Sequence, residues 1–168
     1  MSVIIVNYNV KYFLAQCLLS ICKSTVDLDV IVADNNSTDG SLDFLRPKFP
    51  EVRFIENQDN TGFAKACNKG LEYAKGDYIL FLNPDTIVPE DCFEKCISFF
   101  ETHPDCGAIG VKMIDGSGKF LKESKRSFPS PLTSMYKLFG LSLLFPKSTA
   151  FSRYHLGHLD KNSAHEVD

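Results

Sequence analysis

The chain has 168 residues and a mass of 18.8 kDa, which suits one domain with a sizeable core and is too short for two ordinary domains. Hydrophobic residues make up 44% of it and charged residues 23%, a globular composition that excludes disorder as its main theme. Lys and Arg total 18 against 21 for Asp and Glu, so the net charge of −3 offers no positive field for a nucleic-acid backbone. We therefore expect no nucleic-acid partner.

Six cysteines are present, but a chain of this size needs no disulfide scaffold. Residues 1–9 lack the basic stretch and long apolar run of an export signal, so we expect a reducing, cytoplasmic setting. Without a CxxC pair to build a zinc site, the cysteines are expected to be buried free thiols. The longest strongly apolar stretch, at residues 138–145, is too short to span a membrane.

Strands and helices are predicted to alternate along the chain. Short β-branched or aromatic runs predict strands at residues 2–6, 29–34, 52–56, 78–82 and 108–114. The first and fourth have the pattern of buried strands, and the fifth is expected to be the last core strand. A 3.6-residue apolar period predicts helices at residues 13–21, 41–45, 63–74 and 93–100. Such alternation is typical of an α/β fold with a mostly parallel central sheet and helices on both faces.

The regular pattern weakens after residue 114. DGSGK at 115–119 is a turn signal, and the next residues contain prolines and several cations. We therefore expect an α/β domain at residues 1–118 and a basic, apolar and incomplete segment at residues 119–168.

Polar residues follow four of the predicted strands. Asn7, Tyr8 and Asn9 follow the first, Asp34 ends the second, ENQDNTG leads out of the third, and NPD at 83–85 follows the fourth. Ligands of open parallel sheets bind beyond the carboxyl ends of the strands. We therefore expect all four polar segments to lie at one edge of the sheet, as a binding site.

The residue types at these points indicate particular chemistry, each with an alternative. Asp85 stands on a proline-stiffened turn, where a carboxylate can coordinate a hard divalent cation; alternatively it caps the next helix. Asp34 can accept a hydrogen bond from a nucleobase or cap its own loop. Tyr8 can contact a nucleobase or simply pack. Gly62 opens a helix whose N–H groups offer a phosphate site, or it only begins that helix.

Four segments, in this order and spacing, resemble family-2 glycosyltransferases of the GT-A fold, the nucleotide-diphospho-sugar transferase type: VIIVNYN at 3–9, VADNNSTDGS at 32–41, NTGFAKACNKG at 60–70 and YILFLNPDT at 78–86. The likeness is to the rhamnosyltransferase-like branch and runs from residue 2 to the end of the chain. It implies a UDP- or dTDP-linked sugar donor, a Mg²⁺ or Mn²⁺ ion, and inverting transfer to a saccharide or lipid-linked acceptor in cell-envelope polysaccharide biosynthesis. Residues 1–118 would then be the donor-binding domain.

The resemblance also implies roles for single residues. The turn from Val6 to Asn9 would surround the base together with Asp34, and Gly62 would line the nucleotide pocket. Asn83 and Asp85 stand where the family has its DxD motif; because Asn83 replaces the first aspartate, Asp85 would be the metal ligand. The implied nucleotide-sugar site consists of Val6, Asn7, Tyr8, Asn9, Asp34, Gly62, Asn83 and Asp85.

The family's general base is usually an aspartate in an acidic ED motif after a Gly-Ala-containing strand, and the sequence has no such segment. We therefore name no catalytic residue and expect the base beyond Asp168. Residues 165–168 resemble the stretch that leads into that strand, so we expect a truncated protein; Asp168 as the base is the alternative.

Two further alternatives stay open. Residues 119–147 either make a peripheral contact with the inner face of the membrane or form a flap over the missing half. The alternative to an enzyme is a non-catalytic nucleotide-sugar-binding or interaction module.

Overall fold

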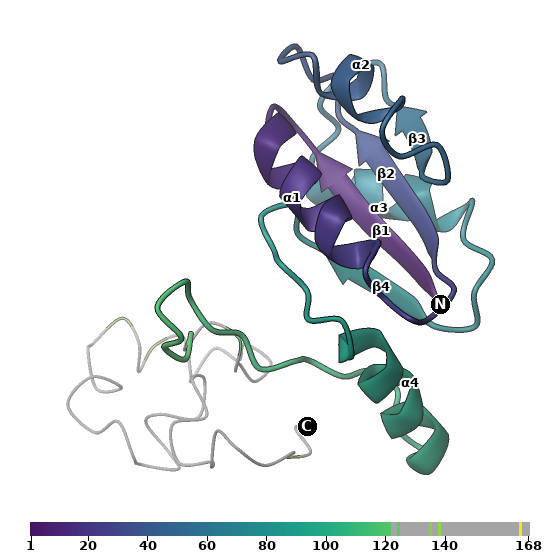
Figure 1. Cartoon of the computed structure of the whole chain (residues 1–168), viewed down its shortest axis with the longest axis vertical. Coiled ribbons are helices and arrows are strands. Elements are labelled where there is room, and N and C mark those ends of the chain that lie inside the picture. Colours follow the sequence, from purple (N-terminus) through teal and green to yellow (C-terminus); the bar gives the residue numbers. More distant parts are fainter. Residues whose placement is uncertain (122–123, 125–134, 136–137, 139–164, 166–168) are drawn as a thin grey trace. The chain divides into compact units, whose positions relative to one another are not determined.

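The computed structural model describes residues 1–121, 124, 135, 138 and 165. It divides into two compact units, Met1–Asp105 and Cys106–Asp168. The expected membrane or flap segment at 119–147 lies largely outside the described residues, and Asp168 lies wholly outside them. The first unit is the α/β part, and its elements follow one another as β1 (Ser2–Asn7), α1 (Lys11–Ile21), β2 (Asp29–Asp34), α2 (Ser41–Leu45), β3 (Arg53–Glu56), α3 (Phe63–Leu71), β4 (Ile79–Leu82) and α4 (Cys92–Thr102) (Figure 1).

The four strands form one parallel sheet in the order β3-β2-β1-β4. The register sets Asn7 of β1 beside Asp34 of β2, and Asp34 beside Glu56 of β3. On the other side of β1, Ile5 lies beside Leu82, the last residue of β4. The expected parallel sheet with strands near 2–6, 29–34, 52–56 and 78–82 is confirmed.

Helices cover both faces of the sheet, as predicted (Figure 1). Apolar side chains of α1 and α2 pack on one face of β1 and β2. The buried cluster that they form with the strands includes Val3, Ile5, Leu14, Cys17, Leu18, Ile21, Val30, Val32 and Leu45. On the other face α3 contributes Ala66 and Cys67, which pack with Val6 and Ala33. All six residues of β1 are buried, because helices lie on both of its faces.

Asp39 joins the starts of two helices. One of its carboxylate oxygens accepts a hydrogen bond from the Lys11 backbone N–H at 2.9 Å, and the other accepts the Ser41 N–H at 3.0 Å and the Ser41 hydroxyl. Partial burial raises the pKa of Asp39, but the bonds from Ser41 and Lys11 outweigh it and hold the pKa below its ordinary value. One carboxylate therefore binds backbone N–H groups at the starts of both α1 and α2, although Asp39 lies far from α1 in the sequence.

The strand expected at residues 108–114 is wrong. In the described part of this segment the one bridge joins Ile114 to Phe120 in antiparallel fashion, and the Leu121 N–H donates to the Met113 carbonyl at 3.0 Å. Val111, Met113 and Ile114 are exposed. An apolar run shows a tendency to be buried, but a strand also needs a neighbouring edge, and here the residues pair only across their own DGSGK turn.

Two other expectations need correction. β4 is less buried than its sequence predicts: Ile79 is 37% and Phe81 48% exposed, because β4 is an edge strand of the described sheet. All six cysteines are free as expected, but only Cys17 and Cys67 are buried. Helical spacing sets the period of the cysteines along a helix, but it does not decide which side of the helix meets the core.

No helix in the described part of the chain has the length and apolar character needed to cross a membrane.

Gly70 marks the closest contact between α3 and the sheet. A Cβ atom at this position would lie 2.6 Å from Cγ2 of Ile4, a branched side chain that is 1% exposed. We expect Gly70→Ala to lower the free energy of unfolding by about 1–3 kcal/mol through overpacking, although alanine favours helix formation. Urea unfolding measures this. The control is Asn68→Ala on the exposed side of α3, and equal stability of the two variants would contradict the expectation.

Candidate functional site

The four polar segments meet at one edge of the sheet, as the sequence predicted. All strands run parallel, so their carboxyl ends point the same way. Asn7, Asp34 and Glu56 lie side by side in the register, and Asn83 follows the end of β4. Polar side chains from segments as far apart as residues 7 and 83 are thereby brought to a common edge.

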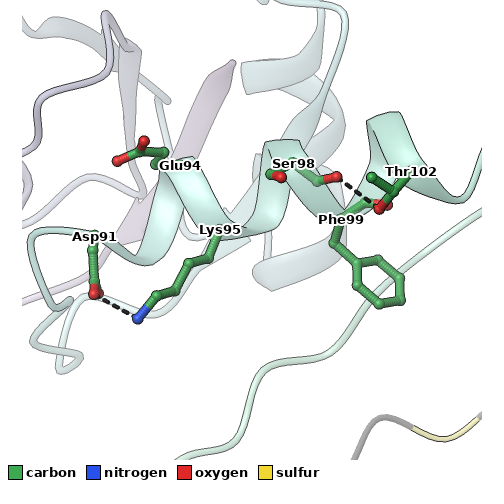
Figure 2. Close-up of a pocket in the computed structure, with 6 residues that line it drawn as sticks. All are labelled: Asp91, Glu94, Lys95, Ser98, Phe99 and Thr102. Carbon is green, nitrogen blue, oxygen red and sulfur yellow. Dashed lines mark hydrogen bonds and ion pairs between the residues drawn. The ribbon is translucent and has the colours of Figure 1, made fainter.

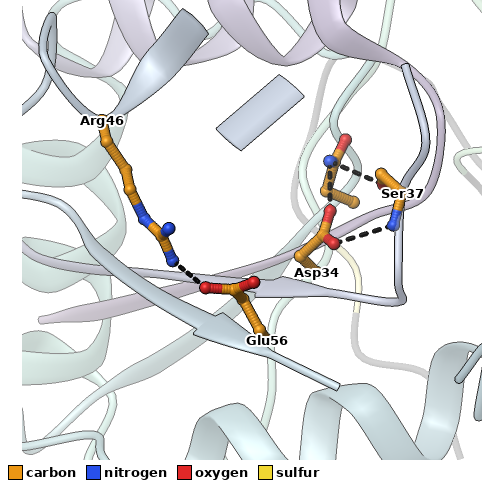
Figure 3. A network of polar contacts seen from close by, with 5 residues as sticks. Asp34, Ser37, Arg46 and Glu56 are labelled. Carbon is orange, nitrogen blue, oxygen red and sulfur yellow. Dashed lines mark hydrogen bonds and ion pairs between the residues drawn. The ribbon is translucent and has the colours of Figure 1, made fainter. Parts of the chain in front are cut away.

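Asn7 and Asp34 form a buried pair at the centre of this edge. Asn7 is 0% and Asp34 2% exposed, and Nδ2 of Asn7 donates to Oδ1 of Asp34 at 2.6 Å and to Oγ of Ser37 at 3.1 Å. The Ser37 backbone N–H donates to the other carboxylate oxygen of Asp34 at 2.9 Å (Figure 3). Because a carboxylate only accepts hydrogen bonds, the contact between Asn7 and Asp34 shows that the amide of Asn7 turns its NH₂ group toward Asp34. Within the described part of the chain, Oδ1 of Asn7 is a buried acceptor without a donor.

The turn after β1 is held against the loop after β2. The backbone N–H of Asn9 donates to Oγ of Ser37 at 3.0 Å, and Oδ1 of Asn9 accepts the Thr38 N–H at 2.7 Å. Asn9 has φ 56°, the left-handed conformation that asparagine tolerates better than most residues. Tyr8, next to it, is 48% exposed at the sheet edge. Val6, which the resemblance placed in the site, is buried in the core beneath α3.

Asn35 connects the loop after β2 to the loop after β3, and sequence reasoning missed it. Its Oδ1 accepts hydrogen bonds from Nδ2 of Asn57 at 2.8 Å and Oγ1 of Thr61 at 3.2 Å. Its Nδ2 donates to Oδ1 of Asn60 at 3.2 Å and to the Gly62 carbonyl at 3.4 Å. The one signal was that both loops are rich in Asn and Thr and follow strands that are neighbours in the sheet. Asn35 thus sets the position of residues 57–62 just before α3.

Gly62 has φ 80° and is exposed, and no atom of the described residues lies within 4 Å of the place where a Cβ would stand. Only glycine adopts this backbone conformation readily, so Gly62 starts α3 in a way that another residue would strain. Its N–H donates to Oδ1 of Asn60 at 3.0 Å. The open space beside Gly62 and the start of α3 leave room for a ligand group at the same sheet edge.

Asn83 and Asp85 lie exposed on a turn that follows β4, where the Thr86 N–H donates to the Asn83 carbonyl at 3.3 Å. Beneath this turn lies Cys17 of α1: burial raises the pKa of its thiol to about 12, and the charge of Asp85 adds to the effect. The side-chain oxygens of Asn83 and Asp85 are hard donors of the kind that suit Mg²⁺ and Mn²⁺. Among the described residues no three His, Cys, Asp or Glu side chains form a cluster that could hold a metal ion.

An open hollow runs along one side of α4 (Figure 2). Six residues of that helix region line it: Asp91, Glu94, Lys95, Ser98, Phe99 and Thr102. None of the site residues expected from the sequence is among them. The hollow is a groove in a helix surface, where Lys95 pairs with Asp91 at 2.5 Å.

Comparison with known proteins gives the family of this chain. The model of "Glycosyl transferase family 2" matches residues 2–159. The chain belongs to this family. The minor teichoic acid biosynthesis protein GgaB of Bacillus subtilis is 35% identical over 124 residues, which cover 68% of this chain and 14% of that protein.

Two solved structures share the fold. TarS 1–349 of S. aureus, in complex with UDP, has a TM-score of 0.62 at 23% identity, and the match covers 79% of this chain and 38% of that one. The mannosyltransferase PcManGT of Pyrobaculum calidifontis, in complex with GDP-Man and Mn²⁺, has a TM-score of 0.58 at 24% identity over 67% of this chain and 35% of that one. The GT-A type of fold inferred from the resemblance is thereby confirmed. The chain spans well under half the length of these proteins.

Replacing Asn35 tests its role as the link between the two loops. Asn35→Ala removes four hydrogen bonds and leaves partly buried groups of Asn57 and Thr61 unpaired, so we expect the free energy of unfolding to fall by about 1–3 kcal/mol. Urea unfolding measures the loss. Gln58→Ala, at an exposed position of the same loop, is the control and should unfold like the wild type. Wild-type stability of Asn35→Ala would show that the link contributes nothing.

Proposed function

We propose that this chain forms the donor-binding part of a glycosyltransferase, which transfers a sugar from a nucleotide diphosphate to a saccharide or lipid-linked acceptor with inversion at the anomeric carbon. The observation that carries the proposal is the convergence, at one sheet edge, of the buried Asn7–Asp34 pair and the exposed carboxylate of Asp85. Family membership supports it, as does the UDP complex of TarS. A cytoplasmic location, membrane contact and the rhamnosyltransferase-like branch stay predictions.

The base is proposed to bind where Asn7 and Asp34 present acceptors. Within the part of the chain that the structure describes, Oδ1 of Asn7 has no donor, and each oxygen of the Asp34 carboxylate accepts one hydrogen bond and has a further lone pair. In UDP and dTDP the base carries one ring N–H, from which such acceptors would receive a hydrogen bond, and this supports a UDP- or dTDP-linked donor. Tyr8 and Asn9, both exposed at the rim, would contact the base from the side.

The diphosphate is proposed to lie between the start of α3 and the Asn83–Asp85 turn. Backbone N–H groups in the first turn of α3, which follows Gly62, favour an anion. Asn83 would reach the ribose through its amide, and Asp85 would hold a Mg²⁺ or Mn²⁺ ion. When bound, such an ion offsets the negative charge on the departing diphosphate. The general base is expected outside the residues described.

Calorimetric titration with UDP and dTDP, each with and without Mn²⁺, tests this assignment. We expect binding to the wild type that strengthens with Mn²⁺, and a loss of at least about tenfold in the Mn²⁺-dependent affinity of Asp85→Ala, because a bond to a charged group contributes about 1.5–3 kcal/mol. The matched control is Asp27→Ala, an exposed aspartate before β2, at the amino edge of the sheet. Equal Mn²⁺ effects in Asp85→Ala and the control would contradict the metal-binding role.

An assay of nucleotide release from the sugar donor separates the enzyme from a binding module. Release that depends on an added acceptor supports transfer. Binding of the nucleotide without acceptor-dependent release would instead favour the non-catalytic module.

A further inference from the structure

One side of α1 contacts both ends of the segment that carries Asp85. Cys17 and Ser20 are three residues apart, so they lie on the same side of the helix, and they are 0% and 7% exposed. Sγ of Cys17 donates to the carbonyl oxygen of Asn83 at 3.8 Å, a long contact that suits the weak thiol donor. Oγ of Ser20 accepts the backbone N–H of Val88 at 3.1 Å.

The hydroxyl of Ser20 is used in both directions. It donates to the carbonyl of Cys17 at 2.7 Å, and this bond turns its lone pairs toward Val88. Val88 is 7% exposed, so its N–H is removed from water and depends on a protein acceptor. The two contacts therefore enclose residues 83–88, with buried anchors at each end and the exposed Asp85 between them.

The same helix also contacts the loop after β2, which follows Asp34 in the chain. At its first residue, Lys11, the backbone N–H donates to Asp39 and the ammonium group donates to the Asp39 carbonyl at 2.7 Å. A helix is stiff, and Lys11 and Ser20 are separated by about 14 Å along it at about 1.5 Å per residue. Through α1, the loop after β2 and the Asp85 turn are held at a set separation.

We propose that Cys17 and Ser20 are positioning residues that clamp residues 83–88 to α1 and so set the place of Asp85 relative to the Asn7–Asp34 pair. The metal-binding part of this role rests on the proposed function. Both side chains are buried under the turn, so they act through Asn83 and Val88 and do not touch the donor. Groups that orient a metal ligand from behind typically change metal affinity by about 10–100-fold when they are lost.

Two measurements on the purified chain test the clamp. Amide hydrogen exchange of residues 83–88, without ligand, reports whether the segment is held. UDP titration with and without Mn²⁺ reports whether Asp85 is positioned. The variants are Ser20→Ala and Cys17→Ala, with Ser20→Thr and Cys17→Ser as conservative replacements that keep a hydroxyl. Val30→Ala is the control: it removes buried apolar volume at the amino end of β2, away from the edge.

We expect Ser20→Ala to speed exchange at Val88 by about fivefold to tenfold, the loss of one hydrogen bond. We also expect it to reduce the Mn²⁺-dependent gain in UDP affinity by about tenfold while metal-free UDP binding is unchanged. Cys17→Ala should act in the same direction but less, because a thiol is the weaker donor. Ser20→Thr and Cys17→Ser should restore the wild-type values. Val30→Ala should lower overall stability and leave both readouts unchanged.

Three results would overturn the proposal, and each has a distinct meaning. Unchanged exchange at residues 83–88 in Ser20→Ala would show that no clamp exists. Faster exchange with an unchanged Mn²⁺ effect would leave Cys17 and Ser20 as structural residues only. Absence of Mn²⁺-dependent UDP binding in the wild type would overturn the proposed function and the metal-binding role of the clamp, while hydrogen exchange would still decide whether the segment is held.

Discussion

The parallel pairing of β1 with β2 on one side and β4 on the other is the constraint on which the rest of the described structure depends. The chain can pass from one strand to a parallel neighbour only through a crossover connection, which is usually a helix. In this chain a helix follows each of the four strands of the described sheet. The helices then cover the faces and bury β1 completely. All carboxyl ends of the described strands emerge at one edge, where chain segments distant in sequence present polar groups together.

The loops at this edge are held by side chains from other loops rather than by local helix caps. α1 and α3 have no side-chain cap bond from their own N-cap residue, yet Asp39 bonds the Lys11 N–H and Asn35 bonds the residues before α3. Asn7, Asp34 and Asn35 are nearly inaccessible to water, where an unbonded polar group is costly. Satisfying these groups requires both loops to keep one arrangement. The edge is therefore more ordered than exposed turns of the same composition would be.

The two faces of the sheet differ in the size of their apolar clusters and in the part of the site that they support. The face covered by α1 and α2 contains the larger apolar cluster, and it also supports the turn of Asn83 and Asp85 through Cys17 and Ser20. The face under α3 contains the smaller cluster, where Gly70 lets the helix approach Ile4 closely. One helix thus joins the core to the turn of Asn83 and Asp85, and another brings its N-terminus to the same edge. Packing and function share the same elements.

The apolar period of the chain was enough to predict four strands, four helices and their alternation, because burial of one helix face and of short β-branched runs leaves a direct mark on the sequence. The strand-end position of Asn7, Asp34 and Asn83 followed from the same reasoning. The period failed at residues 108–114 and at β4, where exposure depends on whether a neighbouring strand is present. The sequence by itself therefore determined the elements and the edge at which polar groups gather. Only the tertiary structure decided which polar groups pair: the bonds of Asn7 with Asp34, Asn35 with Asn57 and Ser20 with Val88 join residues from 22 to 68 positions apart, and no local pattern records such partners.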